Sequence, residues 1–484
     1  MQLSVDSRND KVFLDAEVPL VVDLDGTLVK TDLLWETALI LLRRQPWKFF
    51  WFFLWILRGK AFLKAAIAAE TELDASHLPY DQVLVQQLRE AHASGRTLIL
   101  ATGSHQKLAM AVSHHLQLFH DVIASDGTIN TVADHKRDIL VQRYGERQFD
   151  YVGNSSADLA IWRSARRAYS VTTRAFKLDR RHSTERVGGD RMGLPQALLK
   201  AMRPRQWLKN LLVFVPILAA HLLLSDTVVK GLIAFVCFSC AASSAYLLND
   251  TLDVHDDRVH LEKRKRPLAA GHLPLPLGLM MAPILAGAAV ALALSLSLKF
   301  LAVVLVYLCA TLVYSLYLKR LMMVDVVTLA ILYTLRIVGG GVATGIELSF
   351  WLLSFSFFIF LSLALLKRHS ELYNLAKAGK DKTRGRAYRV EDKLVVSMLG
   401  VNSGFVALII FMLYFNSENV LRLYKQPVYL IGIVPIIMLW LGRLWILSSR
   451  GLVNEDPILF VSKDKRGLVL IFAALMLAVM GSIA

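Results

Sequence analysis

The stretch NDTLDVHDDRVHLEKRKRP at residues 249–267 sets four aspartates directly before five cations. An α-helix brings positions i, i+3 and i+7 to one face, so Asp250, Asp253 and Asp257 share a face, with Asn249 beside them. Mg²⁺ is bound in proteins through one or two carboxylates plus substrate phosphates. The cations just beyond suit phosphate oxygens, above all Arg258, Lys263 and Arg266. The pattern predicts a Mg²⁺–pyrophosphate site, and the alternative is a charged loop that only follows the basic-loop rule of membrane proteins.

A second group of residues that could take part in catalysis lies near the N-terminus, in VPLVVDLDGTLVKTD at 18–32. The apolar run predicts a buried parallel strand that delivers Asp23 and Asp25 to its carboxyl end, where α/β folds place ligands. Three further sequence motifs follow in order, and each lies at or near the expected end of a strand. They are RTLILATGS at 96–104 with Thr102, Lys136 ahead of DILVQRYG, and FDYVGNSSADLAIW at 149–162 with Asn154 and Asp158.

These four pieces, in this order, resemble the motifs of the haloacid dehalogenase (HAD) phosphatase superfamily. The resemblance implies a Rossmann-like α/β domain with a helical cap. It also implies that Asp23 attacks phosphorus, that Asp25 is the general acid/base, and that Thr102 holds a phosphoryl oxygen. Lys136 would neutralise charge. The implied Mg²⁺ ligands are Asp23, Asp25, Asn154 and Asp158.

One position departs from that family, which usually has aspartate where this sequence has Asn154. An amide keeps an oxygen ligand but loses a charge, so we expect weaker Mg²⁺ binding. Two interpretations stay open, an active phosphatase and a degenerate HAD domain that serves as scaffold or regulator.

The segment QPWKFFWFFLWILRGK at 45–60 is aromatic and apolar, but it is too short to span a bilayer. It falls where the family builds its cap. We expect it to dock on the bilayer or on the membrane domain, because Trp and Phe suit the headgroup zone; a buried cap helix is the alternative.

Composition limits the class of protein. The 484 residues are 55% hydrophobic, with a mean hydropathy of +0.46, which indicates a membrane protein with a substantial soluble part. The net charge of +16 favours anionic partners such as lipid headgroups, phosphates and pyrophosphates rather than nucleic acid. The three cysteines lie within apolar runs and predict no disulfide framework.

Long apolar segments fill the chain beyond residue 206, and a bilayer needs about 20 residues per helix. We predict nine spans, at 207–224, 228–248, 277–296, 299–318, 323–344, 350–366, 394–415, 428–447 and 467–484. The more basic loops at 249–276, 367–393 and 448–466 predict a multi-pass protein of the bacterial inner (cytoplasmic) membrane. The N-terminus, which has no signal-peptide pattern, would be cytoplasmic and the C-terminus outside. The predicted domains are residues 1–175 (HAD-like), a basic interfacial linker at 176–205, and a membrane domain at 206–484.

The NDxxDxxxD pattern after the second predicted span resembles the UbiA superfamily of intramembrane prenyltransferases, over 203–484. That resemblance implies an all-α membrane domain and transfer of a prenyl chain from its diphosphate to an aromatic acceptor. The family's second motif, DxxxD after the sixth span, is replaced here by LLKRHSELYN, with Lys367, Arg368 and Glu371.

That replacement resembles one branch of the superfamily, the decaprenyl-phosphate phosphoribosyltransferases. Two more segments agree with the branch, MRPRQWLKN at 202–210 and YSLYLKRLMMVDVVTLAILYTLRIVGG at 314–340. They add the expected substrate-binding residues Lys209, Asn210, Tyr314, Lys319, Asp325 and Arg336. Charges within apolar spans indicate function, although Asp325 and Arg336 share a helix face, so an ion pair that only orients helices is the alternative.

The expected reaction is Mg²⁺-dependent transfer of 5-phosphoribosyl from phosphoribosyl pyrophosphate to a polyprenyl phosphate. The HAD domain would then remove the 5-phosphate, leaving polyprenyl-phosphoryl-ribose for cell-envelope glycan synthesis. One alternative is a conventional UbiA enzyme that joins a prenyl diphosphate to an aromatic acceptor. Another is a scaffold HAD domain beside a lipid-binding membrane domain. The oligomeric state, a homo-oligomer included, and the prenyl length stay open.

Overall fold

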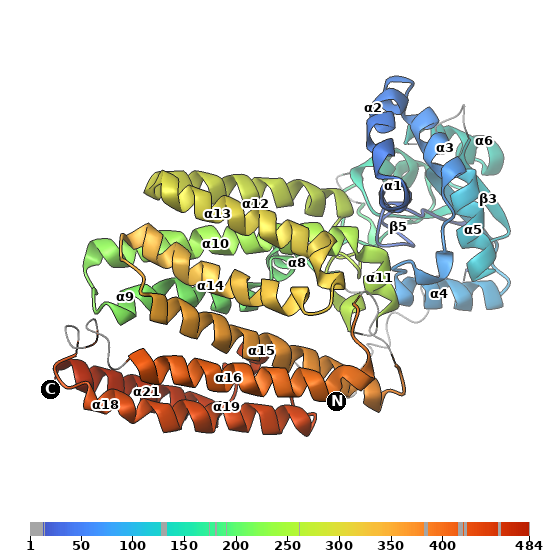
Figure 1. Ribbon diagram of the computed structural model, residues 1–484. Helices are drawn as coiled ribbons and strands as arrows, with labels where there is room; N and C mark the ends of the chain where they lie inside the picture. Colours follow the sequence, from blue (N-terminus) through green and yellow to red (C-terminus); the bar gives the residue numbers. More distant parts are fainter. Residues whose placement is uncertain are drawn as a thin grey trace. The chain divides into compact units, whose positions relative to one another are not determined.

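The protein is described by a computed structural model (Figure 1). It describes residues 13, 15–126, 133–173, 175–179, 182–189, 191–260, 262–381, 386–414, 420, 424–453 and 456–483. The chain forms two compact units. Unit 1 comprises residues 1–202 and 247–281, and unit 2 comprises residues 203–246 and 282–484.

Unit 1 is built on a parallel sheet of six strands in the order β3-β2-β1-β4-β5-β6. The strands are β1 Leu20–Val22, β2 Leu98–His105, β3 Asp121–Ser125, β4 Asp150–Gly153, β5 Ala168–Ser170 and β6 Glu185–Arg186. Val22 in the central strand pairs with Leu100 on one side and Val152 on the other. The residues that follow these positions therefore lie side by side at the carboxyl ends of the strands, where such sheets bind ligands. The predicted α/β fold is confirmed at this level.

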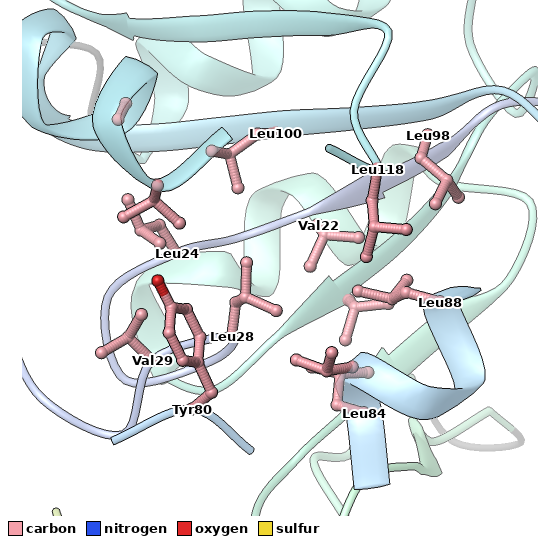
Figure 2. Close-up of a cluster of buried hydrophobic side chains, with 14 of the residues drawn as sticks. Val22, Leu24, Leu28, Val29, Tyr80, Leu84, Leu88, Leu98, Leu100 and Leu118 are labelled. Carbon is pink, nitrogen blue, oxygen red and sulfur yellow. The ribbon is translucent and has the colours of Figure 1, made fainter. Parts of the chain in front are cut away.

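One face of the sheet is covered by an apolar cluster that Figure 2 shows. Val22, Leu98 and Leu100 point from the strands toward Leu84 and Leu88 of a covering helix. All five side chains are buried. Burial of this apolar surface stabilises the sheet and fixes the strand ends that carry the polar residues.

Helices connect the strands of unit 1. They are α1 Leu33–Arg44, α2 Phe49–Leu57, α3 Lys60–Glu70, α4 Gln82–Ala93, α5 Gln106–Leu116, α6 Asp134–Tyr144, α7 Leu159–Ser164 and α8 Leu194–Ala201, with 3-10 turns η1 Pro46–Lys48, η2 Ala75–His77 and η3 Ser156–Asp158. Three of them, α1 to α3, form an insertion between β1 and β2, where the helical cap was expected. Helix α1 begins because Asp32 caps it, accepting from the Leu34 N–H.

Residues 247–281 belong to the same unit. They contain the end of α10 (Ser225–Leu252), α11 (Val254–Val259), η5 (Lys263–Lys265) and the start of α12 (Leu275–Leu296). Asp253 lies between α10 and α11 and is the N-cap residue of α11. The acidic motif is therefore shared by two helices and does not lie on one continuous α-helix.

Unit 2 is helical, and its long helices run side by side (Figure 1). They are most of α10 and α12, with α13 Leu298–Leu316, α14 Val324–Thr344, α15 Phe350–Lys377, α16 Lys393–Tyr414, α19 Ile433–Ser449 and α21 Lys465–Ile483. The shorter elements are η4 Pro204–Phe214, α9 Val215–Ala219, η6 Leu318–Arg320, η7 Val390–Asp392, α18 Val428–Ile431 and α20 Pro457–Val461. The helix Lys465–Ser482 is buried over only 11% of its apolar window. Such outward apolar surface is what lipid covers.

Within the described residues, eight helices are long and apolar enough to cross a membrane, at Ser225–Leu252, Leu275–Leu296, Leu298–Leu316, Val324–Thr344, Phe350–Lys377, Val390–Tyr414, Val428–Ser449 and Lys465–Ser482. Eight predicted spans are thus confirmed as candidates. The ninth, 207–224, is wrong as a regular helix, because the chain there forms η4 and α9. Pro216 lacks the N–H that a continuous helix needs. The opposite placement of the two termini rested on nine spans, and it stays a prediction.

Candidate functional site

Asp23 lies directly beyond β1 and is buried. Its Oδ2 accepts a hydrogen bond from the Thr27 hydroxyl at 2.9 Å, and its Oδ1 accepts one from Lys136 Nζ at 2.8 Å. Burial raises the pKa of Asp23 to about 6, while the Lys136 charge works against the shift. The arrangement presents a desolvated carboxylate beside the ammonium group of Lys136.

Asp25 is held by neutral donors. Its Oδ2 accepts from the hydroxyls of Thr102 at 2.9 Å and Ser104 at 2.7 Å, and its Oδ1 accepts from the Leu33 N–H at 2.9 Å. Burial raises the pKa of Asp25, and the charge of Asp32 adds to the rise. A carboxyl group with a raised pKa can hold a proton for transfer. Thr102, expected on a phosphoryl oxygen, contacts this carboxylate here.

Lys136 links Asp23 to the end of β4. Its ammonium also donates to the Tyr151 hydroxyl at 3.0 Å, and Tyr151 donates to Asp158 Oδ1 at 2.9 Å. Asp158 Oδ2 accepts from the backbone N–H groups of Asn154 and Ser155, each at 3.0 Å. The sheet therefore brings together all the residues that the HAD motifs singled out. Tyr151 and Ser104 were missed, although each lies within a motif that the sequence pointed to.

Asn154 lies against Gly26 of the first motif. A Cβ at Gly26 would collide with the Asn154 amide, and Gly26 has φ +73°, a conformation that glycine adopts readily. The carboxylates of Asp23 and Asp158 and the amide oxygen of Asn154 are all hard oxygen donors. This donor set fits Mg²⁺, with one charge fewer than three carboxylates would give.

The acidic motif of 249–267 is organised by Arg266. Its Nη1 donates to Asp250 Oδ1 at 3.0 Å and to Asp257 Oδ2 at 2.6 Å. Both aspartates are 2% exposed, and burial raises the pKa of Asp257 against the opposing charge of Arg266. Lys263 Nζ lies 3.9 Å from Asp257 Oδ1. The structure thus brings two carboxylates to one cation, whereas Asp253, at the helix junction, and Asn249 are only partly buried.

Among the described residues there is no cluster of three or more Asp, Glu, His or Cys side chains that could hold a metal ion. Asp250 and Asp257 nevertheless lie close together, since both accept a hydrogen bond from Arg266 Nη1. Two carboxylate ligands from the protein are enough for Mg²⁺, because this ion takes its remaining ligands from water and substrate phosphates. Asp250 and Asp257 fit that role, with Arg266 in position to contact a phosphate.

Arg258, expected to bind pyrophosphate, lies in a buried ion pair within unit 1. Its Nη1 and Nη2 donate to the two carboxylate oxygens of Glu36 at 2.9 and 2.5 Å, and its Nε donates to the Ala269 carbonyl at 3.0 Å. Nearby, Arg43 donates to Asp256 at 2.5 Å. No sequence signal marked Glu36, which is an ordinary acidic residue in the first turn of α1.

A cavity of about 500 Å³ adjoins these pairs. It is lined by Ile40, Arg43, Arg44, Glu72, Leu73, Asp74, His77, Leu78, His255, Asp256, Arg258 and Val259. Three arginines face three carboxylates, so the charges nearly balance. The lining does not select for anions.

In unit 2, two lysines share one carboxylate. Lys209 Nζ of η4 lies 2.7 Å from Asp456 Oδ2, and Lys367 Nζ of α15 lies 3.2 Å from the same atom. Lys209 also lies 5.4 Å from the centre of the Tyr333 ring. Asp456 was missed, although a charged residue at the edge of an apolar segment could have been noted.

Arg336 lies close to this group, with its guanidinium 5.5 Å from the centre of the same Tyr333 ring, but it contacts neutral atoms. It donates to Asn210 Oδ1 at 2.8 Å, to the Leu332 carbonyl and to the Tyr307 hydroxyl at 2.8 Å. Asp325 is engaged elsewhere, so the structure does not pair these two residues. Two cations, Lys209 and Lys367, therefore share the Asp456 carboxylate, and a third, Arg336, lies on the Tyr333 ring beside Lys209.

A second charged cluster surrounds Asp325. Its Oδ2 lies 3.0 Å from Arg368 Nη2 and 3.6 Å from Arg386 Nη1, and its Oδ1 accepts from the Tyr388 hydroxyl at 2.7 Å. Arg368 also pairs with Glu371. Within the described residues, the buried Nε of Arg368 has no hydrogen-bond partner. A buried donor of this kind is costly unless a ligand satisfies it.

The remaining expected residues lie near these clusters. Tyr314, at the end of α13, is close enough for the charges of Arg368 and Lys367 to act on it. Lys319 is partly buried in η6. Arg386 and Tyr388 were missed, because the loop that carries them has no apolar or acidic pattern.

Comparison with known proteins agrees with this architecture. The model of the UbiA prenyltransferase family matches residues 213–463. An uncharacterized protein, y4nM of Sinorhizobium fredii, is 33% identical over 96% of this chain and 92% of its own length. The decaprenyl-phosphate phosphoribosyltransferase of Mycolicibacterium smegmatis is 38% identical over 42% of this chain and 66% of its own length.

Among solved structures, a UbiA homologue from Archaeoglobus fulgidus bound to GPP and Mg²⁺ is 18% identical, covering 58% of this chain and 96% of that one, with a TM-score of 0.43. The family model covers more than half of the sequence, and the match to the Sinorhizobium protein covers both units. The chain therefore belongs to the UbiA prenyltransferase family.

Proposed function

We propose that this UbiA-family protein transfers a 5-phosphoribosyl group from phosphoribosyl pyrophosphate to a polyprenyl phosphate. The observation that carries the proposal is the surplus of positive charge in unit 2, where Lys209 and Lys367 share the carboxylate of Asp456 and Arg336 lies over the Tyr333 ring that Lys209 also faces. A charge within a membrane domain is costly and indicates a ligand of opposite sign. An aromatic acceptor would supply no such charge, whereas both substrates of this reaction carry phosphate.

The carboxylates of Asp250 and Asp257 would hold Mg²⁺, and through that ion the pyrophosphate end of the donor. The chemistry that Mg²⁺ supplies at such a pair is neutralisation of the departing pyrophosphate. Arg266 already bridges both carboxylates, so it can turn from them to a phosphate oxygen when the donor binds. An arginine suits this exchange because its planar fork donates to carboxylates and phosphates in similar geometry.

The reaction is a substitution at the anomeric carbon. An oxygen of the lipid phosphate forms the new C–O bond, and the bond to pyrophosphate breaks with both electrons leaving on pyrophosphate. Lys209 and Lys367 would orient the lipid phosphate, and Arg368 with Arg386 would hold the ribose 5-phosphate. The relatives named decaprenyl-phosphate phosphoribosyltransferase, 38% identical in the case of M. smegmatis, support this assignment.

We further propose that unit 1 is a HAD-type phosphatase that removes the 5-phosphate. Asp23 would attack phosphorus, and Asp25 would give its proton to the released 5-hydroxyl. Asp25 would then take a proton from the water that attacks phosphorus. The bond between phosphorus and the Asp23 oxygen would break, which releases inorganic phosphate and restores the Asp23 carboxylate. The contacts of Asp25, Lys136 and Asp158 around Asp23 support this assignment. The covalent link to unit 2 raises the effective concentration of the lipid product.

The transfer of labelled ribose tests both steps. Detergent-purified protein receives Mg²⁺, polyprenyl phosphate and phosphoribosyl pyrophosphate labelled in the ribose. We expect label in the lipid fraction, and a lipid without 5-phosphate. No label in the lipid fraction, together with prenyl transfer when a prenyl diphosphate and an aromatic acceptor replace these substrates, would favour the conventional UbiA reaction.

A further inference from the structure

Helix α2, FFWFFLWIL at Phe49–Leu57, has an unusual surface. None of its residues is buried. The exposed apolar side chains between positions 47 and 57 are Trp47, Phe49, Phe50, Trp51, Phe53, Leu54, Ile56 and Leu57, with exposed fractions from 49% to 83%. A patch of this size on a folded domain marks an interaction surface.

Only one side of α2 packs on the rest of unit 1. Phe52 and Trp55 contact a small cluster made by α1 and α3, which includes Ala38, Leu41 and Ile67. These few contacts anchor the helix and leave the rest of its circumference to an outside partner. The surface is thus built to bury apolar side chains in something other than its own core.

The flanks of the helix are basic. Arg58 and Lys60 follow directly and are exposed, and Lys48, which pairs with Glu70, precedes it. Aromatic residues bounded by cations are typical of helices that lie in the headgroup region of an anionic leaflet. A bilayer is available to this unit, because the described part of the same chain contains eight candidate spans.

Helix α2 is also close to the Asp23–Asp25 site through its neighbours. In α3, Lys64 Nζ donates to the Gly103 carbonyl at 2.6 Å, in the segment that supplies Thr102 and Ser104 to Asp25. The backbone N–H of Leu33, the first residue of α1, donates to Asp25 itself. The two helices that carry α2 are therefore the ones that border the site.

We propose that α2 inserts into the headgroup region of an anionic bilayer, and that it thereby presents the Asp23–Asp25 site to phosphate esters borne on lipid. The surface recognises the bilayer by its aromatic side chains and by Arg58 and Lys60. The substrate class of unit 1 is then a phosphomonoester whose alcohol is attached to a membrane lipid. This second clause rests on the proposed phosphatase function, whereas the insertion of α2 does not.

Insertion is tested by accessibility of a nitroxide label in the full chain, held in nanodiscs with phosphatidylglycerol. Cys237, Cys240 and Cys309 are replaced by alanine, and the label is placed at Phe53→Cys or, as a control, at His114→Cys on exposed α5. We expect the label at position 53 to collide with oxygen more than with a water-soluble nickel complex, and the reverse at position 114. If the nickel complex collides equally with the label at both positions, the proposal is overturned. Dipolar broadening between labels at position 53 would also overturn it, because it would show that a second copy of this chain covers α2.

The substrate class is tested with paired variants of α2. Phe50→Glu with Phe53→Glu charges the exposed face, and Phe50→Leu with Phe53→Leu keeps it apolar. With lipid-linked phosphoribose in the bilayer, we expect the glutamate variant to release phosphate about tenfold more slowly, the leucine variant to match the wild type, and hydrolysis of water-soluble ribose 5-phosphate to be unchanged in both.

Equal slowing of both substrates would overturn the lipid assignment. No phosphate release from either substrate by the wild type would remove the phosphatase proposal, and the label accessibility would still decide whether α2 inserts.

Discussion

The polar site of unit 1 and the charged clusters of unit 2 have opposite balances of charge. In unit 1, Lys136 contacts Asp23 directly and Asp158 through the Tyr151 hydroxyl, while neutral donors hold Asp25. In unit 2, two cations, Lys209 and Lys367, share the carboxylate of Asp456. A carboxylate-rich site needs a cation and a substrate that brings modest charge, and a cation-rich site needs a polyanion. The contrast suits a phosphatase at the Asp23 site of unit 1 and phosphorylated ligands at the lysines of unit 2.

The largest expected effect separates the two units. Asp23→Asn should lower phosphate release on the order of 10⁴-fold, because it removes the attacking oxygen, and leave transfer of ribose unchanged. Both are read from labelled lipid product. Asp138→Asn, an exposed change in the same unit, is the control. Normal phosphate release by Asp23→Asn would mean that the carboxylate cluster of unit 1 has another purpose.

The acidic motif gives the next effect. Asp250→Asn should slow ribosyl transfer about 10²–10³-fold, since it removes a charged ligand of the leaving group. The matched control is Asp256→Asn, which changes an aspartate of the same motif that is exposed and paired with Arg43; it should be nearly silent. Transfer at the wild-type rate in Asp250→Asn would mean that the motif is a charged loop that only follows the basic-loop rule of membrane proteins.

The cations of unit 2 give a smaller effect on binding. Lys367→Met should raise the KM for polyprenyl phosphate about tenfold to a hundredfold, as expected when one hydrogen bond to a charged group is lost. Lys377→Met, at the exposed end of the same helix, should leave the KM unchanged. If Lys367→Met instead lowers kcat alone, the lysine acts on the departing pyrophosphate, and its assignment to the lipid phosphate is wrong.

The smallest effect concerns the amide in unit 1. Asn154→Asp adds a carboxylate beside Asp158, so we expect half-maximal phosphate release at roughly threefold to tenfold less Mg²⁺. Gln148→Glu adds the same charge on the exposed surface and should not change the Mg²⁺ requirement. An unchanged requirement in Asn154→Asp would place the metal away from this side chain.

Much of the fold could be predicted because its signals are local. The strand that ends in Asp23 and the apolar runs of eight helices are each readable from consecutive residues. Segment 204–219 was misread because hydropathy does not report the type of helix, and Pro216 divides the segment into two elements. The site was only partly predictable. Asp456 and Arg386 reach their clusters through tertiary packing. The sequence shows only that Asp456 borders an apolar segment, and it gives no signal for Arg386.

The 3-10 segment η4 also affects how relatives should be aligned. Its 11 residues extend about 22 Å at the 3-10 rise, a distance that an α-helix covers only with about 15 residues. A relative that uses an α-helix here would need about four more residues to bring the counterparts of Lys209 and Asn210 to the same depth. A gap at this point of an alignment would then record a change in helix type and not the loss of a loop.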